Sequence, residues 1–474
     1  MSEDDVFLKR GKHHFFLSHR KTIYYLTMKR RSFLGLAASG AVLLNQKTFA
    51  HHVKPSKVVI LGAGFSGLSA ALTLFEKKID FVILESCNRI GGRVFTHKID
   101  EQADLRVELG AEWVGESHEE VKKLCERFKI QLNDNRFDTD LYFRGKYSKV
   151  NKWDFDADWK KKLEGLLEAF KNLNSEQQKL FDRLNWWRYL VNNGIPENDL
   201  YFRELLDSTD FGESIRHVSA YAAISEYAYS SKKNEMDLKM EGGNSTLANK
   251  IADLIGREKI LTDHHVEAII QKGKNITVKC ADGKTFDADR VICTVPAFAL
   301  GQINFSPALP KSKLHALDAL QYARINKCVG LFSQRFWKRE DFDMITDTPA
   351  HYFYHATKNQ NHVKGAITSY SIGEKADMFG WHGDDYRRQT IIDSIRPVGD
   401  ARNYLQKVVN YNWGQDRYSK GAYAIYATGQ WFTIQPELKK PHLNVHFAGE
   451  HLAEWQGFME GAIVSGRDAA LEAI

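Results

Sequence analysis

Apolar residues along this chain alternate between short continuous runs and longer stretches with helical period. Residues 57–61 are apolar after Lys57, which is typical of a buried parallel strand. Helical periodicity follows from residue 68 to about residue 77, and a second apolar run occupies residues 81–84. Strand, helix and strand in this order predict an α/β fold built on a parallel sheet.

Further elements are predicted along the rest of the chain. Residues 155–229 are rich in Trp and Tyr and helical in period, which predicts a helical insert. Residues 290–296 predict a buried strand that stops at a proline, and residues 325–332 predict an apolar strand. A helix is expected to begin around Met459, after a strand at residues 445–447. At 474 residues, two domains are the default expectation.

A predicted targeting sequence precedes these elements. Arg30 and Arg31 stand before an apolar run at residues 33–44. This arrangement predicts a twin-arginine signal and export to the periplasm or the medium. The run has about 12 residues, short of the ~20 that span a membrane, so a membrane anchor is the weaker alternative, as is a basic surface helix. Residues 1–50 are therefore expected to be an extension and signal peptide, with translation beginning at Met28.

Composition narrows the possible partners. The 66 basic and 60 acidic residues are scattered, so the net charge of +6 favours no nucleic-acid partner. The 5 cysteines are too few and too widely spaced for a disulfide scaffold or a CxxC metal site, and we expect free, mostly buried thiols. The paired histidines lack spaced partner ligands, so no metal site is predicted.

Regularly spaced glycines follow the first predicted strand. Gly62, Gly64 and Gly67 form a GxGxxG motif. Its first glycine makes a tight turn, its second lets the backbone approach a pyrophosphate, and its third allows close packing of helix on strand. The helix N-terminus adds unpaired N–H groups for the phosphates. Glu85 ends the second strand, where its carboxylate can accept hydrogen bonds from ribose hydroxyls, so the unit predicts a dinucleotide site.

Two further segments favour FAD over NAD in this site. Residues 89–93 place two glycines between arginines, which suits the flavin-side phosphates and the ribityl chain. Residues 445–450 repeat a pattern of strand, glycine and acid before the helix expected at Met459. The N-terminal dipole of that helix would face the electron-rich pyrimidine edge of a reduced flavin.

With these motifs in place, residues 56–474 resemble the flavin amine oxidase family of monoamine oxidases, polyamine oxidases and L-amino acid oxidases. The resemblance is weakest at residues 140–235. Its most specific pieces, in family order, are residues 109–115, 241–244, 325–328, 418–423 and 455–462. The chain is accordingly expected to be an exported bacterial member of this family.

The resemblance implies an α/β fold with two parts. One is a Rossmann-like FAD-binding domain, discontinuous in sequence, at residues 51–135, 238–300 and 405–474. The other is an α+β substrate-binding domain at residues 136–237 and 301–404, built from the helical insert and a strand-rich segment.

The resemblance also implies site residues. Lys327 corresponds to the family lysine that holds a water against flavin N5, whereas the residues alone would also allow a surface lysine. Tyr423 and Phe458 match two facing rings that align the amine and favour its neutral form, although core packing is the alternative. Trp455 is a further catalytic candidate. The implied cofactor-binding residues are Gly62, Gly64, Gly67, Glu85, Arg93, Gly110, Ala111, Glu112, Trp113, Val266, Gly449, Glu450, Phe458 and Met459.

Two departures from monoamine oxidases carry information. Ala422 stands where those enzymes have the cysteine of the flavin thioether, so FAD is expected to be bound non-covalently. The sequence has no apolar tail after the last predicted helix, so no membrane anchor is expected once the signal is removed.

The leading prediction is FAD-dependent oxidation of a primary or secondary amine to an imine, which water hydrolyses to an aldehyde or ketone, with dioxygen reduced to hydrogen peroxide. An L-amino acid oxidase that forms a 2-oxo acid and ammonia stays open. Glu112 and Trp113 stand where those enzymes place a carboxylate-clamping arginine, so Arg324 or Arg144 would have to replace it. An amine dehydrogenase with an exported electron acceptor and a flavin-binding structural protein also stay open. The expected partners are a small amine or amino acid and dioxygen, with a homodimer as the candidate assembly.

Overall fold

A parallel sheet carries the predicted dinucleotide motif. The computed structural model describes residues 57–474, so the predicted twin-arginine signal lies outside the described residues. Within them this sheet has five strands, and every neighbouring pair is parallel. Its strands are, in spatial order, β22 (Val445–Phe447), β13 (Arg290–Cys293), β1 (Lys57–Leu61), β2 (Asp80–Leu84) and β9 (Ile260–Leu261). The strands predicted at residues 57–61, 81–84, 290–296 and 445–447 are thereby confirmed.

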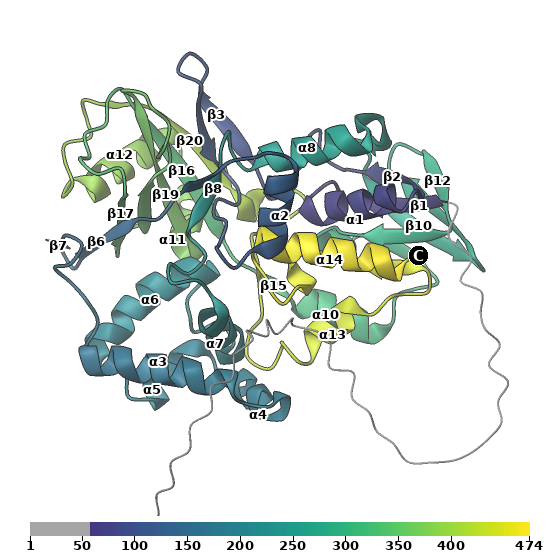
Figure 1. Ribbon diagram of the computed structural model, residues 1–474, viewed down its shortest axis with the longest axis horizontal. Helices are drawn as coiled ribbons and strands as arrows, with labels where there is room; N and C mark the ends of the chain where they lie inside the picture. Colours follow the sequence, from purple (N-terminus) through teal and green to yellow (C-terminus); the bar gives the residue numbers. More distant parts are fainter. Residues whose placement is uncertain (1–56) are drawn as a thin grey trace, which may run out of the picture. The chain divides into compact units, whose positions relative to one another are not determined.

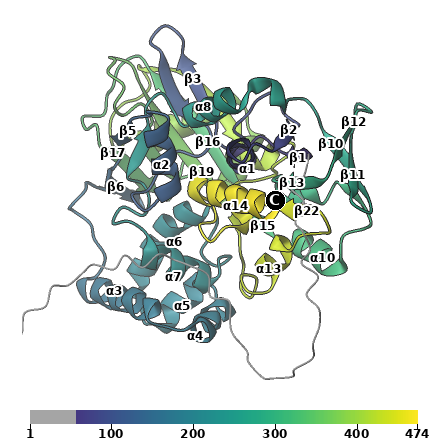
Figure 2. The ribbon, with the colours of Figure 1, turned by 45° about the vertical axis from the view of Figure 1, so that its right-hand side comes forward.

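Three helices pack together beside this sheet. They are α1 (Phe65–Glu76), α8 (Ser245–Ile255) and α14 (Met459–Glu472). Helix α1 contacts β1, β2 and β13, and both views show it running alongside α14 (Figures 1 and 2). It begins earlier than residue 68, directly after Gly64, because the glycine turn itself leads into the first helical turn. An all-parallel sheet needs such cover, since its strands are apolar on both faces.

A four-stranded sheet adjoins the parallel sheet through β12. Within the described residues it consists of β12 (Thr285–Ala288), β11 (Asn275–Cys280), β10 (Val266–Lys272) and β14 (Asn304–Ser306). Strand β14 pairs with β10 in parallel. Residues 304–306 therefore belong with the dinucleotide-binding part, which corrects the boundary predicted at residue 301.

A seven-stranded sheet forms the other large β element of the described chain. Its spatial order is β20 (Leu405–Asn412), β16 (Ile325–Phe332), β19 (Gly365–Ile372), β18 (Tyr352–His355), β17 (Phe342–Thr346), β6 (Asp138–Phe143) and β7 (Lys146–Ser148). Strand β16 has the predicted bounds and is buried throughout. It pairs with β19 on one side and β20 on the other, so residues 405–412 belong to this sheet and not to the predicted FAD-binding segment 405–474.

Helices fill the segment predicted to be a helical insert and also cover the seven-stranded sheet. The insert contains α3 (Ala157–Lys171), α4 (Ser175–Lys179), η1 (Leu180–Arg183), α5 (Trp186–Asn192), α6 (Glu197–Phe211) and α7 (Ala220–Tyr229). Helices α11 (Gly373–Trp381) and α12 (Asp384–Ile395) pack on the sheet. Figures 1 and 2 both show α3 to α7 gathered in one group.

Short elements connect these parts. The paired strands are β3 (Thr96–Asp100) with β4 (Leu105–Glu108), β5 (Leu132–Asp134) with β8 (Leu238–Met240), and β15 (Gln321–Tyr322) with β21 (Ala424–Ile425). The remaining helices are α2 (Glu119–Arg127), η2 (Arg257–Lys259), α9 (Ala297–Leu300), α10 (Lys311–Ala319), η3 (Trp413–Gln415), α13 (Ile434–Lys439) and η4 (Glu450–Leu452).

One hydrophobic core joins the two parts that the sequence predicts as separate domains. Val59 of β1, Trp186 of α5 and Val329 of β16 belong to the same cluster of buried side chains. The described residues form one compact unit, so the two predicted domains do not separate in the structure. All 5 cysteines are free, and all but Cys87 are buried. No helix in the described residues is long and apolar enough to cross a membrane.

Candidate functional site

One cavity collects most of the predicted site residues. Every predicted cofactor residue except Gly67 lines it, and so do Lys327 and Tyr423. We call the part lined by the glycines after β1 and by Glu85 the dinucleotide end, and the part lined by residues of the helical insert and of β16 the substrate end. The predicted dinucleotide site and the predicted reactive residues are thus walls of one cavity.

Two glycine loops meet at the dinucleotide end. Gly62 has a φ of +99°, and a Cβ at Gly67 would lie 1.9 Å from the Gly62 carbonyl oxygen. Gly67 therefore packs the start of α1 onto β1, behind the cavity wall. Gly64 differs, because a Cβ there would meet nothing closer than 3.9 Å, at the Cα of Gly92. The space at Gly64 is open toward the cavity, as close approach of a pyrophosphate requires.

The N-terminus of α1 carries an unused polar group toward this space. Its N-cap residue Gly64 offers no side-chain cap, so the first N–H groups of the helix are not satisfied by a side chain. Ser66 lines the cavity, is 4% exposed, and its Oγ has no hydrogen-bond partner. A buried orphan hydroxyl beside a helix N-terminus fits a phosphate oxygen, so these residues fit the pyrophosphate of FAD.

Glu85 is held in place by two backbone N–H groups. Its Oε2 accepts from Ala63 N at 2.6 Å and its Oε1 from Cys87 N at 2.8 Å. A carboxylate has further lone pairs, so ribose hydroxyls can still donate to it. The side chain is 8% exposed and lines the cavity, which places it as the prediction requires.

Arg93 and Glu450, which were predicted as separate cofactor contacts, form an ion pair of 2.5 Å between Nη1 and Oε1. Although burial opposes ionisation, the Arg93 guanidinium brings the pKa of Glu450 below its ordinary value. Glu450 also accepts from Ala424 N at 3.2 Å and Gly457 N at 3.0 Å. Glu450 thereby ties together the segments that carry Tyr423 and Phe458.

The aromatic candidates divide into two groups. Tyr423 and Phe458 line the cavity, and the Tyr423 hydroxyl donates to the backbone carbonyl of Asp210. Trp455, predicted as a further catalytic residue, is not among the described residues that line the cavity. Its ring packs edge-on against Phe458 at 5.9 Å, and the His118 ring lies 5.1 Å from Phe458. Trp455 supports Phe458 from behind.

Of the lining carboxyl side chains that sequence analysis missed, three lie in or shortly after helices α6 and α7: Asp210, Glu226 and Glu235. Burial raises the pKa of Asp210 to about 7, raises that of Glu226 well above its ordinary value, and raises that of Glu235. The buried Oε1 of Glu226 has no hydrogen-bond partner. These residues lie in or beside the segment where the resemblance is weakest, and no motif spacing marks them.

Lys327 is buried in the cavity wall rather than exposed. The residue is 3% exposed, and Nζ donates to Gly110 O at 2.7 Å, with longer contacts to Glu112 Oε2 at 3.2 Å and Glu108 O at 3.3 Å. Burial lowers the pKa of Lys327, although Glu112 opposes the shift. An ammonium has three N–H donors, so a water held toward a flavin would replace one of the longer contacts.

Glu112 is a buried member of an ion-pair network. It is 2% exposed and contacts two lysines, Lys239 and Lys327. Although burial opposes ionisation, these lysines bring the pKa of Glu112 below its ordinary value. Glu116, four residues further along the chain, is not among the described lining residues and pairs with Arg136.

The two arginines considered for carboxylate binding lie elsewhere. Arg324 is paired with Glu213 at 2.6 Å and with Asp377 at 2.8 Å. The Arg144 guanidinium lies over the rings of Phe143 and Tyr201. Neither arginine is among the described residues that line the cavity.

A known family matches nearly all of the described chain. The family described as flavin containing amine oxidoreductase matches residues 65–474. The chain belongs to this family. The match includes the helix after the glycine turn, β16 with Lys327, and the segments of Tyr423 and Phe458.

This flavin amine oxidoreductase is similar over most of its length to proteins named as oxidases of amines and of amino acids. A probable flavin-containing monoamine oxidase A of Dictyostelium discoideum is 23% identical over 455 residues, covering 86% of this chain and 95% of the relative. An L-amino-acid oxidase of Protobothrops flavoviridis is 26% identical over 452 residues, with 88% of each chain covered.

Solved structures share the fold. Cyclohexylamine oxidase from Brevibacterium oxydans gives a TM-score of 0.77 at 21% identity, covering 88% of this chain and 98% of the other. Wild-type putrescine oxidase bound to putrescine gives 0.76 at 20% identity, again covering 88% and 98%. The arrangement of an α/β dinucleotide part with a second, β-rich part is therefore that of known amine oxidases.

Proposed function

We propose that this enzyme is an oxidase of primary or secondary amines that lack a carboxylate, with dioxygen as electron acceptor and hydrogen peroxide as product. The observation that carries the proposal is the set of carboxyl groups at the substrate end of the cavity. Asp210, Glu226 and Glu235 line it, and the arginines among the described lining residues, Arg89 and Arg93, are both engaged by other groups of the protein. Arg89 donates to Gly92 O at 2.7 Å, and Arg93 pairs with Glu450.

Each part of the cavity then has a role. A flavin held in the cavity would supply the hydride acceptor for oxidation of the amine to an imine, which water then hydrolyses. Ser66 and the N-terminus of α1 hold the pyrophosphate, and Glu85 holds the ribose. A substrate ammonium would favour the ionised form of the carboxyl groups at the substrate end, which would in turn attract it. Tyr423 and Phe458 form an apolar slot that favours the neutral amine, the form from which a hydride can leave.

We further propose that the FAD is bound without a covalent link. Ala422 lines the cavity and offers no sulfur. The cysteine that does line it, Cys87, follows Glu85 at the ribose end, and burial raises the pKa of its thiol to about 12. A protonated thiol at that end is a poor partner for the flavin ring. FAD should therefore leave with the supernatant when the protein is precipitated in acid, and yellow colour retained on the chain would contradict this.

An L-amino acid oxidase is the second candidate, because proteins of that name are among the relatives. Its substrate would bring a carboxylate into a cavity whose substrate end carries carboxyl groups. Burying a carboxylate without a partner costs several kcal/mol, which corresponds to roughly 100-fold or more in rate.

The comparison of tyramine with tyrosine tests the choice, because only the carboxylate differs. We expect tyramine to have the higher kcat/KM by about 100-fold or more, as estimated from the cost of burying the carboxylate. Peroxide release should not require an added electron acceptor, whereas dependence on such an acceptor would indicate a dehydrogenase. If tyrosine matches tyramine, the amino acid oxidase replaces the proposal.

We also propose export by the twin-arginine route, on the basis of Arg30, Arg31 and the apolar run at residues 33–44. Cell fractionation of the full chain should place flavin-loaded enzyme outside the cytoplasm. Replacement of both arginines by lysine should retain it inside.

A further inference from the structure

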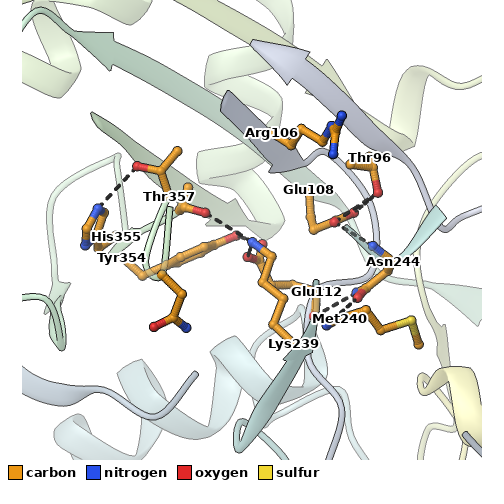
Figure 3. A network of polar contacts seen from close by, with 12 residues as sticks. Thr96, Arg106, Glu108, Glu112, Lys239, Met240, Asn244, Tyr354, His355 and Thr357 are labelled. Atoms are coloured by element: carbon orange, nitrogen blue, oxygen red, sulfur yellow. Dashed lines mark hydrogen bonds and ion pairs between the residues drawn. The ribbon is translucent and has the colours of Figure 1, made fainter. Parts of the chain in front are cut away.

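A buried ion pair joins the walls of two cavities. Glu112 lines the catalytic cavity, whereas Lys239, in β8, lines a second cavity together with Glu108 and Lys358. Lys239 Nζ lies 2.6 Å from Glu112 Oε1 and also donates to the Ala356 carbonyl at 3.1 Å. Figure 3 shows Lys239 and Tyr354 reaching the Glu112 carboxylate from different elements. No motif in the sequence marks Lys239 as part of the site.

Two lysines share the Glu112 carboxylate. Oε1 contacts Lys239 at 2.6 Å, whereas Oε2 contacts Lys327 at 3.2 Å and accepts from Tyr354 at 2.6 Å. Lys239 is 8% exposed, Lys327 is 3% exposed and Glu112 is 2% exposed. Charges interact strongly in such a poorly solvated site, so the shorter contact decides which lysine the carboxylate neutralises more completely.

We propose that Lys239 is a positioning residue that holds Glu112 at its nearer oxygen, so that the carboxylate only partly neutralises Lys327 and Lys327 can release a proton beside the flavin. The inference rests on the proposed function, because it takes Lys327 to face the flavin. It adds a role for a residue that belongs to the wall of the second cavity.

Reoxidation of the flavin needs such a proton. Reduction of dioxygen to hydrogen peroxide takes two electrons and two protons, of which a reduced flavin held in the cavity would supply both electrons and one proton. Lys327 supplies the other proton and regains one from solvent before the next turnover. A lysine fully neutralised by its own carboxylate would hold its proton more tightly.

The charged groups around Lys327 give the sign of the effect. Burial lowers the pKa of Lys327, Glu112 and Glu108 raise it, and Lys239 lowers it. The Glu108 carboxylate accepts from the hydroxyl of Thr96 at 2.9 Å and from Asn244 N at 2.9 Å. The rings that face the Lys327 ammonium are those of Trp113, Tyr354 and Tyr370.

Removal of either partner of Glu112 should therefore move the pKa of Lys327 in opposite directions. Lys239→Met removes a repelling charge and frees Glu112 for Lys327, which raises the pKa. Glu112→Gln removes the attracting charge, which lowers it. Shifts of about one unit or more are expected from charges this close. A general disturbance of the fold has no reason to produce two opposite signs.

Stopped-flow reoxidation measures the effect without any amine. FAD-loaded protein is reduced with dithionite and mixed with dioxygen over a range of pH. The alkaline limb of the rate profile should move to higher pH in Lys239→Met and to lower pH in Glu112→Gln, and Lys239→Arg should restore it. Lys358→Met is the matched control, since Lys358 lines the same second cavity but bonds to the Arg136 carbonyl rather than to Glu112.

A static titration provides a second reading. The visible absorption of oxidised, bound FAD is followed against pH, and its midpoint should shift with the same two signs. Shifts in one direction for both variants, or a shift in Lys239→Met no larger than in Lys358→Met, would overturn the inference. Lys327→Met should abolish the limb. If the alkaline limb of the reoxidation profile persists in Lys327→Met, Lys327 does not face the flavin and its proposed role fails as well. Amine oxidation by the unchanged enzyme, which tests the proposed function, does not depend on that result.

Discussion

The two ends of the cavity are built in different ways to bind the cofactor and the substrate. At the dinucleotide end, the backbone around Gly62, Gly64 and Gly67 at the start of α1 leaves open space for the cofactor. The Ser66 hydroxyl, which has no hydrogen-bond partner, lies beside these glycines. The substrate end is formed by side chains that converge from distant segments, among them Asp210 of α6, Glu226 of α7, Lys327 of β16, and Tyr423 and Phe458 near the C-terminal helix.

This difference predicts two kinds of response to substitution. Where the cofactor binds in a space left free by glycines, one added side chain fills that space, and cofactor binding is lost. Where charges balance one another, removal of one charge shifts the pKa values of the others, and the response is a graded change of rate or pH dependence.

The largest effect is expected at the glycines. Gly64→Val should leave the apoprotein folded, because a Cβ there meets nothing within 3.9 Å, yet weaken FAD binding by about 100-fold or more, since the side chain fills the space of the pyrophosphate. Flavin content by absorbance and unfolding of the apoprotein by circular dichroism give the two readings.

Gly67→Ala is the matched contrast. Its Cβ would lie 1.9 Å from the Gly62 carbonyl oxygen, so the fold itself should lose about 3 kcal/mol or more. A Gly64→Val protein with full flavin occupancy would show that the pyrophosphate does not approach there.

The difference between the two ends also explains what the sequence could predict. Four of the five strands and α1 of the dinucleotide part follow from contiguous apolar runs and from glycines whose backbone roles are local, whereas the two-residue strand β9 was not predicted. Lys327 is predictable because β16 is a single apolar run in a specific motif. The boundary at residue 405 was wrong, because pairing of β20 with β16 is a long-range contact that no local pattern records.

The carboxyl groups of the substrate end and Lys239 could not be found in this way. Asp210 and Glu226 lie in amphipathic helices, where an acidic residue is ordinarily a solvated one. The position of Trp455 could not be predicted for the converse reason, because its neighbours in sequence line the cavity while its own ring packs against Phe458. Whether a charged side chain is buried, or whether a ring lines the cavity, depends on which helices and strands pack together in the fold, and local sequence does not record this.

The second effect in size is expected at Lys327. Lys327→Met should slow reoxidation of the flavin by dioxygen by about 10- to 100-fold, which is the usual effect of removing one preorganised charged donor. FAD binding and reduction by amine should change far less, because these depend on the glycine loops and the aromatic slot. Stopped-flow measurement of both half-reactions separates the two, and an unchanged reoxidation rate would leave Lys327 with a packing role.

A smaller effect is expected for the one carboxylate of the dinucleotide end that is predicted to bind ribose. Glu85→Ala removes the acceptor for the ribose hydroxyls and should raise the Kd of FAD by about 10-fold, as for loss of one hydrogen bond to a charged group. Fluorescence quenching of added FAD measures the Kd. Glu437→Ala is a suitable control, since that carboxylate lies outside the cavity lining and pairs with Lys440. A Kd unchanged in Glu85→Ala would place the ribose elsewhere.

The smallest effect concerns the stability of the substrate end against pH. Burial raises the pKa of Asp210 to about 7, so the folded protein keeps a proton there that the unfolded chain loses near its ordinary value of 3.8. Between these values unfolding releases a proton, and stability falls as the pH rises; above about 7 the loss is constant. Asp210→Asn cannot ionise and should therefore gain about 1 kcal/mol relative to the unchanged enzyme between pH 4.5 and pH 7.5, a figure reduced because the side chain is partly exposed.

Urea unfolding of the FAD-loaded protein at the two pH values measures this gain. Asp400→Asn is the control, because the Arg402 guanidinium lowers the pKa of that exposed carboxyl to about 2 and its effect should not change over this range. If Asp210→Asn changes the free energy of unfolding by the same amount at both pH values, Asp210 is ionised in the folded enzyme. The substrate end would then attract cations at every pH above about 4.5 rather than only near neutrality.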